Sequence, residues 1–163
     1  MRVNYPGLKK MNDMTESMIQ DMSALICRIL DDADHLDHEN YVDHGNHLDH
    51  GNHINQVNHK IKGKLLSQGA EGPIFYVMVE EEPRALKTWA VKFEENHVLG
   101  RCLDLDVYDT WGQSISRQEL GYPRRKCYLC EDYAQHCVRA RQHSEQEVIE
   151  YIEERYGEYR EGK

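Results

Sequence analysis

Apolar side chains recur at spacings of three and four residues early in the chain, a pattern that predicts an amphipathic helix. The pattern covers residues 12–32, where Asn12 or Asp13 can cap the first turn. Its apolar positions are Met14, Met18, Met22, Leu25, Ile26 and Ile29. A methionine-rich stripe at this spacing is usually packing surface, so we expect this face to lie in the core.

The middle of the chain alternates between helical and β-favouring patterns. We expect residues 60–68 to be helical and residues 69–72 to form a turn. Residues 74–79 are mostly β-branched or aromatic and predict a strand. Pro83 suits the first turn of a further helix, which we expect to end near residue 95.

An apolar run at residues 101–109 predicts a second strand, and it carries two aspartates. Asp104 and Asp106 are two residues apart, so in a strand they share one face. Gly112 then forms a turn, and residues 114–116 return as the second arm of a hairpin. The residues expected on the core side are Leu103, Leu105 and Val107.

The Asp104 and Asp106 pair has two interpretations. Burying two carboxylates side by side is costly unless a cation or hydrogen-bond donors neutralise them, and Mg²⁺ takes oxygen ligands while bridging to substrate phosphates. The spacing also arises by chance or at the edge of a sheet.

Two more helices are predicted, at residues 131–142 and 144–157, before a charged tail. The elements together predict an α+β fold, with a small mixed or antiparallel sheet and flanking helices. A length of 163 residues suits one domain spanning residues 1–163.

Composition narrows the function classes. A net charge of −9 argues against general nucleic-acid binding, because phosphate backbones would be repelled. No apolar run reaches the roughly 18 to 20 residues that span a bilayer, and no secretory signal is visible, so we expect a cytoplasmic protein with no membrane partner. A local basic cluster nevertheless suits a small polyanion such as a triphosphate, although on charge alone a solvated basic helix and loop explains it equally well. Its members are Arg117, Arg124, Arg125, Lys126, Arg139 and Arg141.

Residues 34–59 are rich in histidine and poor in apolar residues. The six-residue unit at 43–48 is echoed once, at 49–54, and two copies are too few for a β-solenoid, which needs at least about three. We therefore expect a flexible insertion that binds Zn²⁺, Ni²⁺ or Cu²⁺ weakly through imidazoles. An evolved metal-storage or sensing role is the alternative.

A second metal-ligand pattern lies near the end of the chain. Cys127 and Cys130 form a Cys-x-x-Cys unit, and Cys137 and His143 follow on a predicted helix. Such a set can complete a tetrahedral structural Zn²⁺ site, with His136 as an alternative fourth ligand. Reduced cysteines in a small core and a redox pair are the other interpretations.

Many separated residues between about Gly72 and Ile152 match one known family in order and spacing: Leu86-Lys87, Glu94-Glu95-Asn96-His97, Leu99-Gly100-Arg101, Asp104-Leu105-Asp106-Val107, Ile115-Ser116-Arg117, Glu119-Leu120-Gly121, Arg125-Lys126-Cys127, Cys130, Ala134, Cys137 and Arg139-Ala140-Arg141-Gln142-His143-Ser144. Over this range the chain resembles the apo-citrate lyase phosphoribosyl-dephospho-CoA transferase family, also called holo-citrate lyase acyl-carrier-protein synthase. Asn4-Tyr5-Pro6-Gly7 is similar to the family's turn before its first helix. Only Met1-Arg2-Val3 precede that turn, so we expect a family strand to be missing.

The resemblance implies a nucleotidyltransferase-like active site on the strand that carries Asp104 and Asp106. The expected donor is triphosphoribosyl-dephospho-CoA, the acceptor is a serine of the citrate lyase acyl carrier protein, and pyrophosphate leaves. Asp104 and Asp106 are expected to hold Mg²⁺.

The remaining site residues are expected to serve the substrates. Arg101 and Arg117 can fork onto phosphate oxygens. Lys87, Arg124, Arg125 and Arg139 are expected to bind the donor or an acidic carrier protein.

Three further residues, Glu94, Glu95 and His97, could accept the serine proton, or they could form a solvated helix end. Ser116 lacks the partners of a hydrolase triad. Two non-catalytic alternatives stay open: an impaired family member that binds metal through residues 34–59, and an interaction module built on the cysteine cluster.

Overall fold

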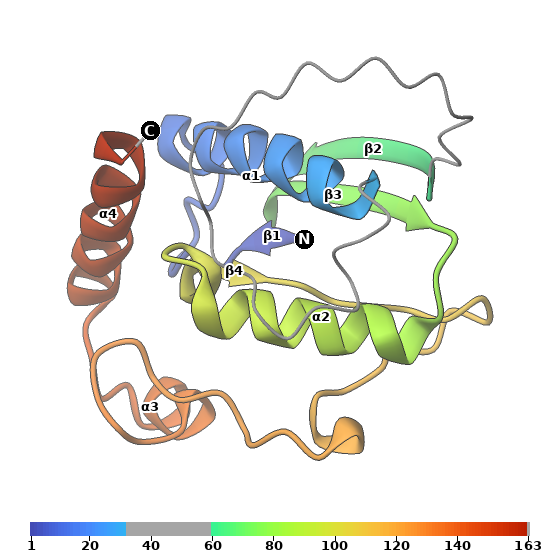
Figure 1. Ribbon diagram of the computed structural model, residues 1–163. Helices are drawn as coiled ribbons and strands as arrows, with labels where there is room; N and C mark the ends of the chain where they lie inside the picture. The colour runs from blue at the N-terminus through green and yellow to red at the C-terminus, as the bar shows by residue number, and fades with distance from the viewer. Residues whose placement is uncertain (32–59, 163) are drawn as a thin grey trace.

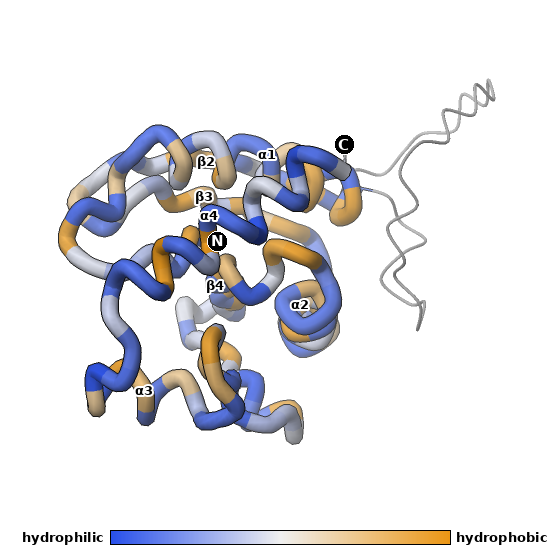
Figure 2. Tube along the Cα trace, turned by 90° about the vertical axis from the view of Figure 1, so that its left-hand side faces the viewer, coloured by the Kyte–Doolittle hydropathy of each residue, from blue (hydrophilic) through white to orange (hydrophobic). Residues whose placement is uncertain are grey.

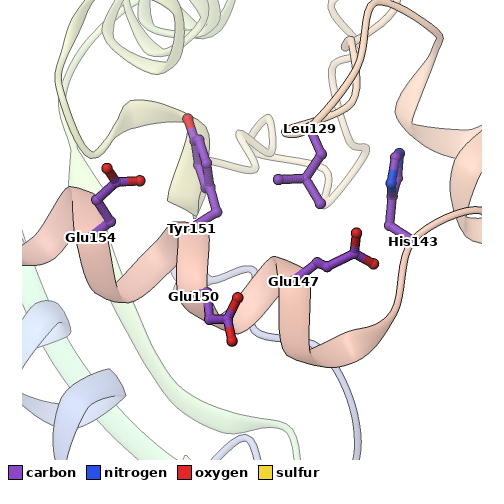
Figure 3. Close-up of a pocket in the computed structure, with 6 residues that line it drawn as sticks. All are labelled: Leu129, His143, Glu147, Glu150, Tyr151 and Glu154. Carbon is purple, nitrogen blue, oxygen red and sulfur yellow. The ribbon is translucent and has the colours of Figure 1, made fainter.

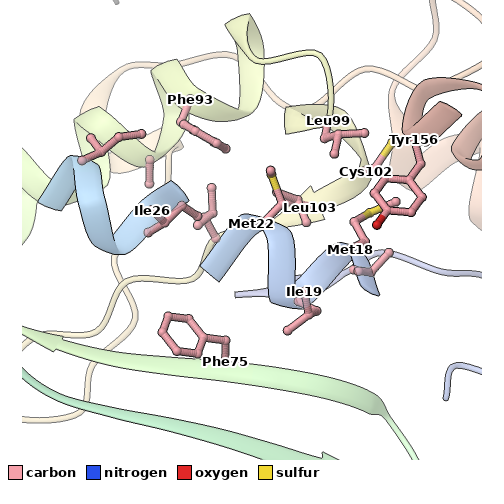
Figure 4. Packing of buried hydrophobic residues seen from close by; sticks show 14 of the residues in the cluster. Met18, Ile19, Met22, Ile26, Phe75, Phe93, Leu99, Cys102, Leu103 and Tyr156 are labelled. Atoms are coloured by element: carbon pink, nitrogen blue, oxygen red, sulfur yellow. The ribbon is translucent and has the colours of Figure 1, made fainter. Parts of the chain in front are cut away.

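The predicted first helix is present as α1 (Asp13–Asp31) in the computed structural model, which describes residues 1–31 and 60–162. Asn12 caps it, because the Asn12 Oδ1 accepts a hydrogen bond of 3.0 Å from the backbone N–H of Thr15. The inner face of α1 is buried, as the sequence predicts; its fully buried side chains include Met18, Ile19, Met22, Ile26 and Leu30. This face forms the centre of the hydrophobic core (Figure 4).

A four-stranded sheet in the order β2-β3-β1-β4 lies under α1 (Figure 1). All its pairings are antiparallel. The strands are β1 (Arg2–Val3), β2 (Ile61–Gly69), β3 (Gly72–Val79) and β4 (Leu103–Asp104). The predicted strand at 74–79 is therefore confirmed, and the α+β fold class is correct. Residues 2–3 themselves provide a strand between β3 and β4, where we expected a strand to be missing.

The helix predicted at residues 60–68 is wrong, because this segment forms β2. It pairs with β3 in a hairpin, with Lys64 opposite Val77 and Leu66 opposite Phe75. Cross-strand pairing with an apolar neighbour outweighs the weak helical preference of this polar segment. Gly72 closes the hairpin with a φ of 85°, where an added Cβ would lie 2.8 Å from the carbonyl oxygen of Lys10.

The helix predicted after Pro83 is confirmed as α2 (Pro83–Asn96), which packs beside α1 in the same core. The Glu82 side chain caps it by accepting a bond of 2.6 Å from the N–H of Ala85. The chain then returns against this helix through the short helix η1 (Gly100–Cys102). Only glycine fits at position 100, because an added Cβ would lie 2.4 Å from the carbonyl oxygen of Phe93.

The strand predicted at 101–109 is only partly correct. Its first residues belong to η1, and β4 contains only two residues. The alternation nevertheless continues, since Leu103, Leu105 and Val107 are buried while Asp106 is exposed. The predicted hairpin is confirmed by the bridge between Tyr108 and Ser114, with Gly112 in its turn at a φ of 78°.

The C-terminal part contains η2 (Gln118–Leu120), α3 (Ala134–Ala140) and α4 (Glu145–Glu161). The helix predicted at 131–142 is shorter than expected, because Lys126 pairs with Tyr133 in a small hairpin before it. The helix predicted at 144–157 is confirmed and begins with a capping box of Ser144 and Glu147. It joins the core through Tyr156, whose hydroxyl donates a bond of 2.8 Å to Asp21.

The histidine-rich prediction for residues 34–59 lies outside the described residues. In the part of the chain that the structure describes, no helix is long and apolar enough to cross a membrane.

Candidate functional site

The two aspartates lie on the solvent face of the chain at and after β4, as the alternation predicts. Asp104 accepts hydrogen bonds from Arg2 at 3.2 Å (Nε) and 2.9 Å (Nη2), and its other oxygen lies 3.4 Å from Nη1 of Arg125. Asp106 is exposed and forms no hydrogen bond or ion pair with any residue that the structure describes. One carboxylate is thus balanced by two guanidinium groups, and the other faces solvent.

The peptide groups between these aspartates are fixed by helix α2. The Oε1 of Glu94 accepts a bond of 2.9 Å from the N–H of Leu105, and the Nζ of Lys87 donates a bond of 2.8 Å to the carbonyl of Leu105. Lys87 and Glu94 are seven residues apart, two helical turns, and therefore lie on the same face of α2. Both side chains are buried. The backbone that carries Asp104 and Asp106 is held on both sides of Leu105.

Glu94 is the most buried acid of the site. Burial raises its pKa, although Arg125, the N–H of Leu105, Lys87 and Arg117 all act in the opposite direction. The ion pairs are long, 3.4 Å to Nη2 of Arg117 and 3.9 Å to Nε of Arg125, so they do not offset the loss of hydration. Glu94 therefore serves as an anchor for two arginines and for the strand.

The predicted arginines divide into two groups. Arg117 and Arg125 join the aspartate site: Arg117 contacts Glu94 and, at 3.2 Å, Glu95, and Arg125 contacts Asp104 and Glu94. Arg125 also donates a bond of 2.7 Å to the carbonyl of Leu103.

The second group forms no hydrogen bond or ion pair with Asp104 or Asp106 in the part of the chain that the structure describes. The Nη2 of Arg101 donates bonds of 2.6 Å to the carbonyls of both Lys126 and Cys127, at the start of the cysteine cluster. Arg124 and Arg139 are exposed, the latter on α3.

The other predicted acid–base residues differ in accessibility. His97 is buried, its ring stacks on Phe93 at 4.7 Å, and its Nδ1 accepts a bond of 3.1 Å from the N–H of Leu99. Glu94 is buried as described, and Glu95 is exposed. The interpretation as a solvated helix end therefore fails for Glu94 and His97.

The cysteine cluster comes together as the spacing predicts. The ligand atoms of Cys127, Cys130, Cys137 and His143 all lie within 4.8 Å of one another. The Cys130 and Cys137 sulfurs are 3.5 Å apart, close to the separation of about 3.7 Å that tetrahedral Zn–S bonds of about 2.3 Å require. His143 Nε2 lies 3.4 Å from the Cys130 sulfur. His136 instead contacts Asp132, so His143 is the fourth member.

The environment of Cys127 favours a thiolate. Burial acts to raise its pKa, but hydrogen bonds from the backbone of Leu129 and Cys130 and from the Cys137 and Cys130 thiols hold the pKa below its ordinary value. Burial raises the pKa of Cys137 to about 12. All five cysteines lie in the described ranges and are free thiols, so the structure contains a candidate Cys₃His metal site. It is the one group of three or more such ligands within the described ranges.

A pocket lies along α4, next to the cluster residue His143 (Figure 3). Its lining is Leu129, His143, Glu147, Glu150, Tyr151 and Glu154. Three carboxylates would repel a polyphosphate, so this pocket does not suit the expected donor.

Arg2 is the site residue that sequence reasoning missed. It is 102 positions away from Asp104, and β1 brings it there by pairing with β4. The sequence offered one signal: a basic residue stands next to Val3 ahead of the Asn4-Tyr5-Pro6-Gly7 turn.

The chain is similar to known proteins over most of its length. The sequence profile of the family described as apo-citrate lyase phosphoribosyl-dephospho-CoA transferase matches residues 39–159. A probable apo-citrate lyase phosphoribosyl-dephospho-CoA transferase of Vibrio cholerae is 43% identical over 89 residues, covering 54% of this chain and 50% of the relative. The transferase of Citrobacter koseri is 35% identical over 80 residues, 49% of this chain and 44% of the relative. The transferase of Escherichia coli is 34% identical over 84 residues, which cover 52% of this chain and 46% of the relative. The chain spans about half the length of the curated relatives it matches.

Proposed function

The chain belongs to the apo-citrate lyase phosphoribosyl-dephospho-CoA transferase family, and on this premise we propose that it is a transferase. It moves the 2′-(5″-phosphoribosyl)-3′-dephospho-CoA group from its triphosphoribosyl donor to a serine of the citrate lyase acyl carrier protein. The serine oxygen bonds to the phosphorus nearest the ribose, the bond from that phosphorus to the pyrophosphate breaks, and the serine proton passes to a base or solvent. A cytoplasmic location of the reaction is part of this proposal.

One observation supports this proposal above the others: two carboxylates on one face, on a backbone fixed by Glu94 and Lys87, lie beside two arginines. Positioning and neutralisation of charge supply most of the acceleration in phosphoryl chemistry. A fixed backbone between Asp104 and Asp106 meets the first requirement. Arg117 and Arg125 meet the second, because a guanidinium fork matches phosphate oxygens.

The family chemistry implies Mg²⁺, and the residues present fit it. Mg²⁺ is bound by one or two carboxylates together with substrate phosphates, so a third protein ligand is not required. Asp106 offers an exposed carboxylate, and Asp104 lies on the same face. Asp104 and Asp106 would hold the ion, which supplies positive charge at the transferred phosphoryl group. Arg125, whose Nη1 lies 3.4 Å from Asp104, would contact the phosphates of the donor beside the ion.

The exposed basic residues are proposed to bind the substrates outside the aspartate site. Arg124 and Arg139 are exposed and serve the negatively charged donor or an acidic carrier protein. Lys87 acts differently from an exposed substrate-binding residue, since its buried ammonium group positions Leu105. Arg101 likewise has a positioning role in this proposal, because it donates hydrogen bonds to the carbonyls of Lys126 and Cys127.

The ion suited to the Cys₃His cluster is Zn²⁺, in a structural role. Three thiolates and an imidazole are a zinc ligand set, and all four positions of a tetrahedron come from the protein, so none is open to substrate. The hydrogen bonds that lower the pKa of Cys127 favour the thiolate that a metal requires.

Intact-mass spectrometry of the apo carrier protein tests the function. The carrier is incubated with this chain, Mg²⁺ and the triphosphoribosyl donor, beside a reaction that contains the Vibrio cholerae relative. A mass increase equal to the phosphoribosyl-dephospho-CoA group, with release of pyrophosphate, is expected. No increase with this chain, while the relative is active, would favour a non-catalytic protein organised around the Cys₃His cluster.

A further inference from the structure

The segment that contains the cysteine cluster has no hydrophobic core of its own. Across residues 117–144, here called the cysteine lobe and described throughout, Cys127 and Cys137 are the only buried residues. No residue of the lobe belongs to the main core cluster or packs against it as a partly buried apolar side chain. In Figures 1 and 2, α3 of this lobe lies at one end of the molecule, away from α1.

A segment of this size requires another source of order. Small units that cannot bury enough apolar surface depend on disulfides or a metal, and metal-binding free energy then becomes folding free energy. The five cysteines are free, so a disulfide does not hold the lobe. Its two buried side chains are themselves ligands of the Cys₃His cluster. The apolar centre of a small domain is here replaced by a metal-ligand set.

Next to the ligand Cys127, two arginines connect the lobe to the aspartate site: one reaches from the site to the lobe, and the other reaches from the lobe to the site. Arg101, just before β4, donates to the carbonyls of Lys126 and Cys127 at 2.6 Å each. Arg125, two residues before the first ligand, donates to the carbonyl of Leu103 at 2.7 Å and reaches Asp104. Residues 125–127 and 101–104 are therefore fastened together next to the ligand Cys127.

The short hairpin around the first two ligands makes this connection stiff. The N–H of Cys127 donates a bond of 2.7 Å to the carbonyl of Asp132, and the N–H of Ala134 donates one of 2.9 Å to the carbonyl of Arg125. Arg125 and the ligand Cys127 thus lie on one arm of a hairpin whose turn carries Cys130. A shift of the ligands shifts the backbone of Arg125.

We propose that binding of one metal ion by Cys127, Cys130, Cys137 and His143 orders the cysteine lobe and thereby places Arg125 at Asp104. The metal site is then a positioning device for the transferase site. This inference relies on the proposed function only for the role of Arg125; the ordering itself does not require the reaction.

Cobalt binding to the full chain tests the metal site without interference from the histidines of residues 34–59. Co²⁺ bound by thiolates gives a sulfur-to-metal charge-transfer absorption, which imidazole and carboxylate ligands alone do not give. We expect this absorption in the native chain and in the control variant Cys27→Ser, which is outside the cluster. We expect it to be lost or strongly reduced in Cys130→Ser. Equal absorption in Cys130→Ser and Cys27→Ser would overturn the site.

Amide hydrogen exchange on the native chain, with Zn²⁺ and after chelation, tests the coupling even if Cys130→Ser folds poorly. Removal of the metal should accelerate exchange about tenfold or more in residues 117–144 and in 101–105, while the interior of α1 stays protected. Unchanged exchange in both segments after chelation would overturn the inference. The result is independent of the transferase assay: metal-dependent protection without transfer rejects the proposed function alone, and transfer without metal-dependent protection rejects this inference alone.

Discussion

The backbone N–H of Leu105 donates a hydrogen bond of 2.9 Å to the buried carboxylate of Glu94. The same residue receives a bond from Lys87 on its carbonyl side. Helix α2 therefore fixes the one residue that separates Asp104 from Asp106, and it does so with groups that do not face solvent. We interpret this contact as the reason that a two-residue strand can hold a site in place.

The carboxylate of Glu94 should affect stability in a pH-dependent way. Burial raises its pKa in the folded chain above the ordinary value of 4.5. Below pH 4.5 Glu94 keeps its proton in both the folded and the unfolded chain, and its full contribution to the free energy of unfolding is present. As the pH rises, the unfolded chain loses its proton first, so the contribution falls until the pH passes the raised folded value. The free energy of unfolding of the native chain, minus that of Glu94→Gln, should therefore decrease with rising pH.

Urea unfolding of both proteins at a series of pH values measures this difference. Glu94→Ala serves as the comparison that also removes the acceptor for the Leu105 N–H, and it should lower the free energy of unfolding by about 1–3 kcal/mol. A difference that grows with pH would show that Arg117 and Arg125 outweigh burial at this carboxylate.

Replacement of Lys87 by methionine keeps the aliphatic packing and removes the donor to Leu105. Because the carbonyl of Leu105 is then buried without its partner, the free energy of unfolding should fall by about 1–3 kcal/mol. Lys92→Met, at an exposed position of the same helix, should change it by no more than about 0.5 kcal/mol. Thermal or urea denaturation decides this, and equal effects of the two substitutions would argue against the contact.

Two glycines should respond to alanine in opposite directions. Gly100→Ala puts a Cβ 2.4 Å from the carbonyl oxygen of Phe93 and 2.6 Å from that of Glu94, so it should destabilise the chain by about 1–3 kcal/mol or more. Gly157 lies in α4 with nothing within 4 Å of an added Cβ, and alanine there should stabilise by about 0.5–1 kcal/mol. The melting temperatures of both variants provide the measurement. A tolerated Gly100→Ala would mean that η1 does not pack on the end of α2 as described.

Much of this fold could be predicted from local pattern, and the failures have physical causes. The helices α1, α2 and α4 and the strand β3 carry clear periodicity or capping signals, and each was found. The strand β2 was missed because its sequence is polar and ambiguous, and its conformation is decided by pairing with β3. The alternation of Leu103, Leu105 and Val107 was predicted correctly although most of that segment is not a regular strand.

In the candidate site, too, local patterns were predictable from the sequence and long-range contacts were not. The spacing of the cysteines and His143 was sufficient to predict their convergence, since a Cys-x-x-Cys unit and a following helix restrict the geometry. The contacts of Lys87 and Glu94 with Leu105 were not predictable, because the spacing of seven shows only that they share a face of α2. Arg2 reaches Asp104 through strand pairing across most of the chain, which a local pattern cannot reveal.

Replacing each aspartate of the pair by asparagine should affect the free energy of unfolding differently. Asp106 forms no hydrogen bond or ion pair with the described residues, so Asp106→Asn should leave the free energy of unfolding within about 0.5 kcal/mol of the native value. Asp104→Asn also weakens partly exposed ion pairs with Arg2 and Arg125, so it should cost about 0.5–1 kcal/mol. Parallel urea titrations of the two variants check this difference, and a strongly destabilised Asp106→Asn would show that its side chain has a structural role.

The most direct measurement is the rate of transfer to the apo carrier protein, followed by intact mass at increasing Mg²⁺, for the native chain, Asp106→Asn and Asp13→Asn. Asp13 is an exposed aspartate in the first turn of α1, remote in sequence from the site. Asp106→Asn should fold normally and lose at least about 100-fold in rate, with its dependence on Mg²⁺ abolished or shifted to higher concentration. Asp13→Asn should match the native chain. Full activity and an unchanged dependence on Mg²⁺ in Asp106→Asn would contradict a metal-assisted transfer at these two carboxylates.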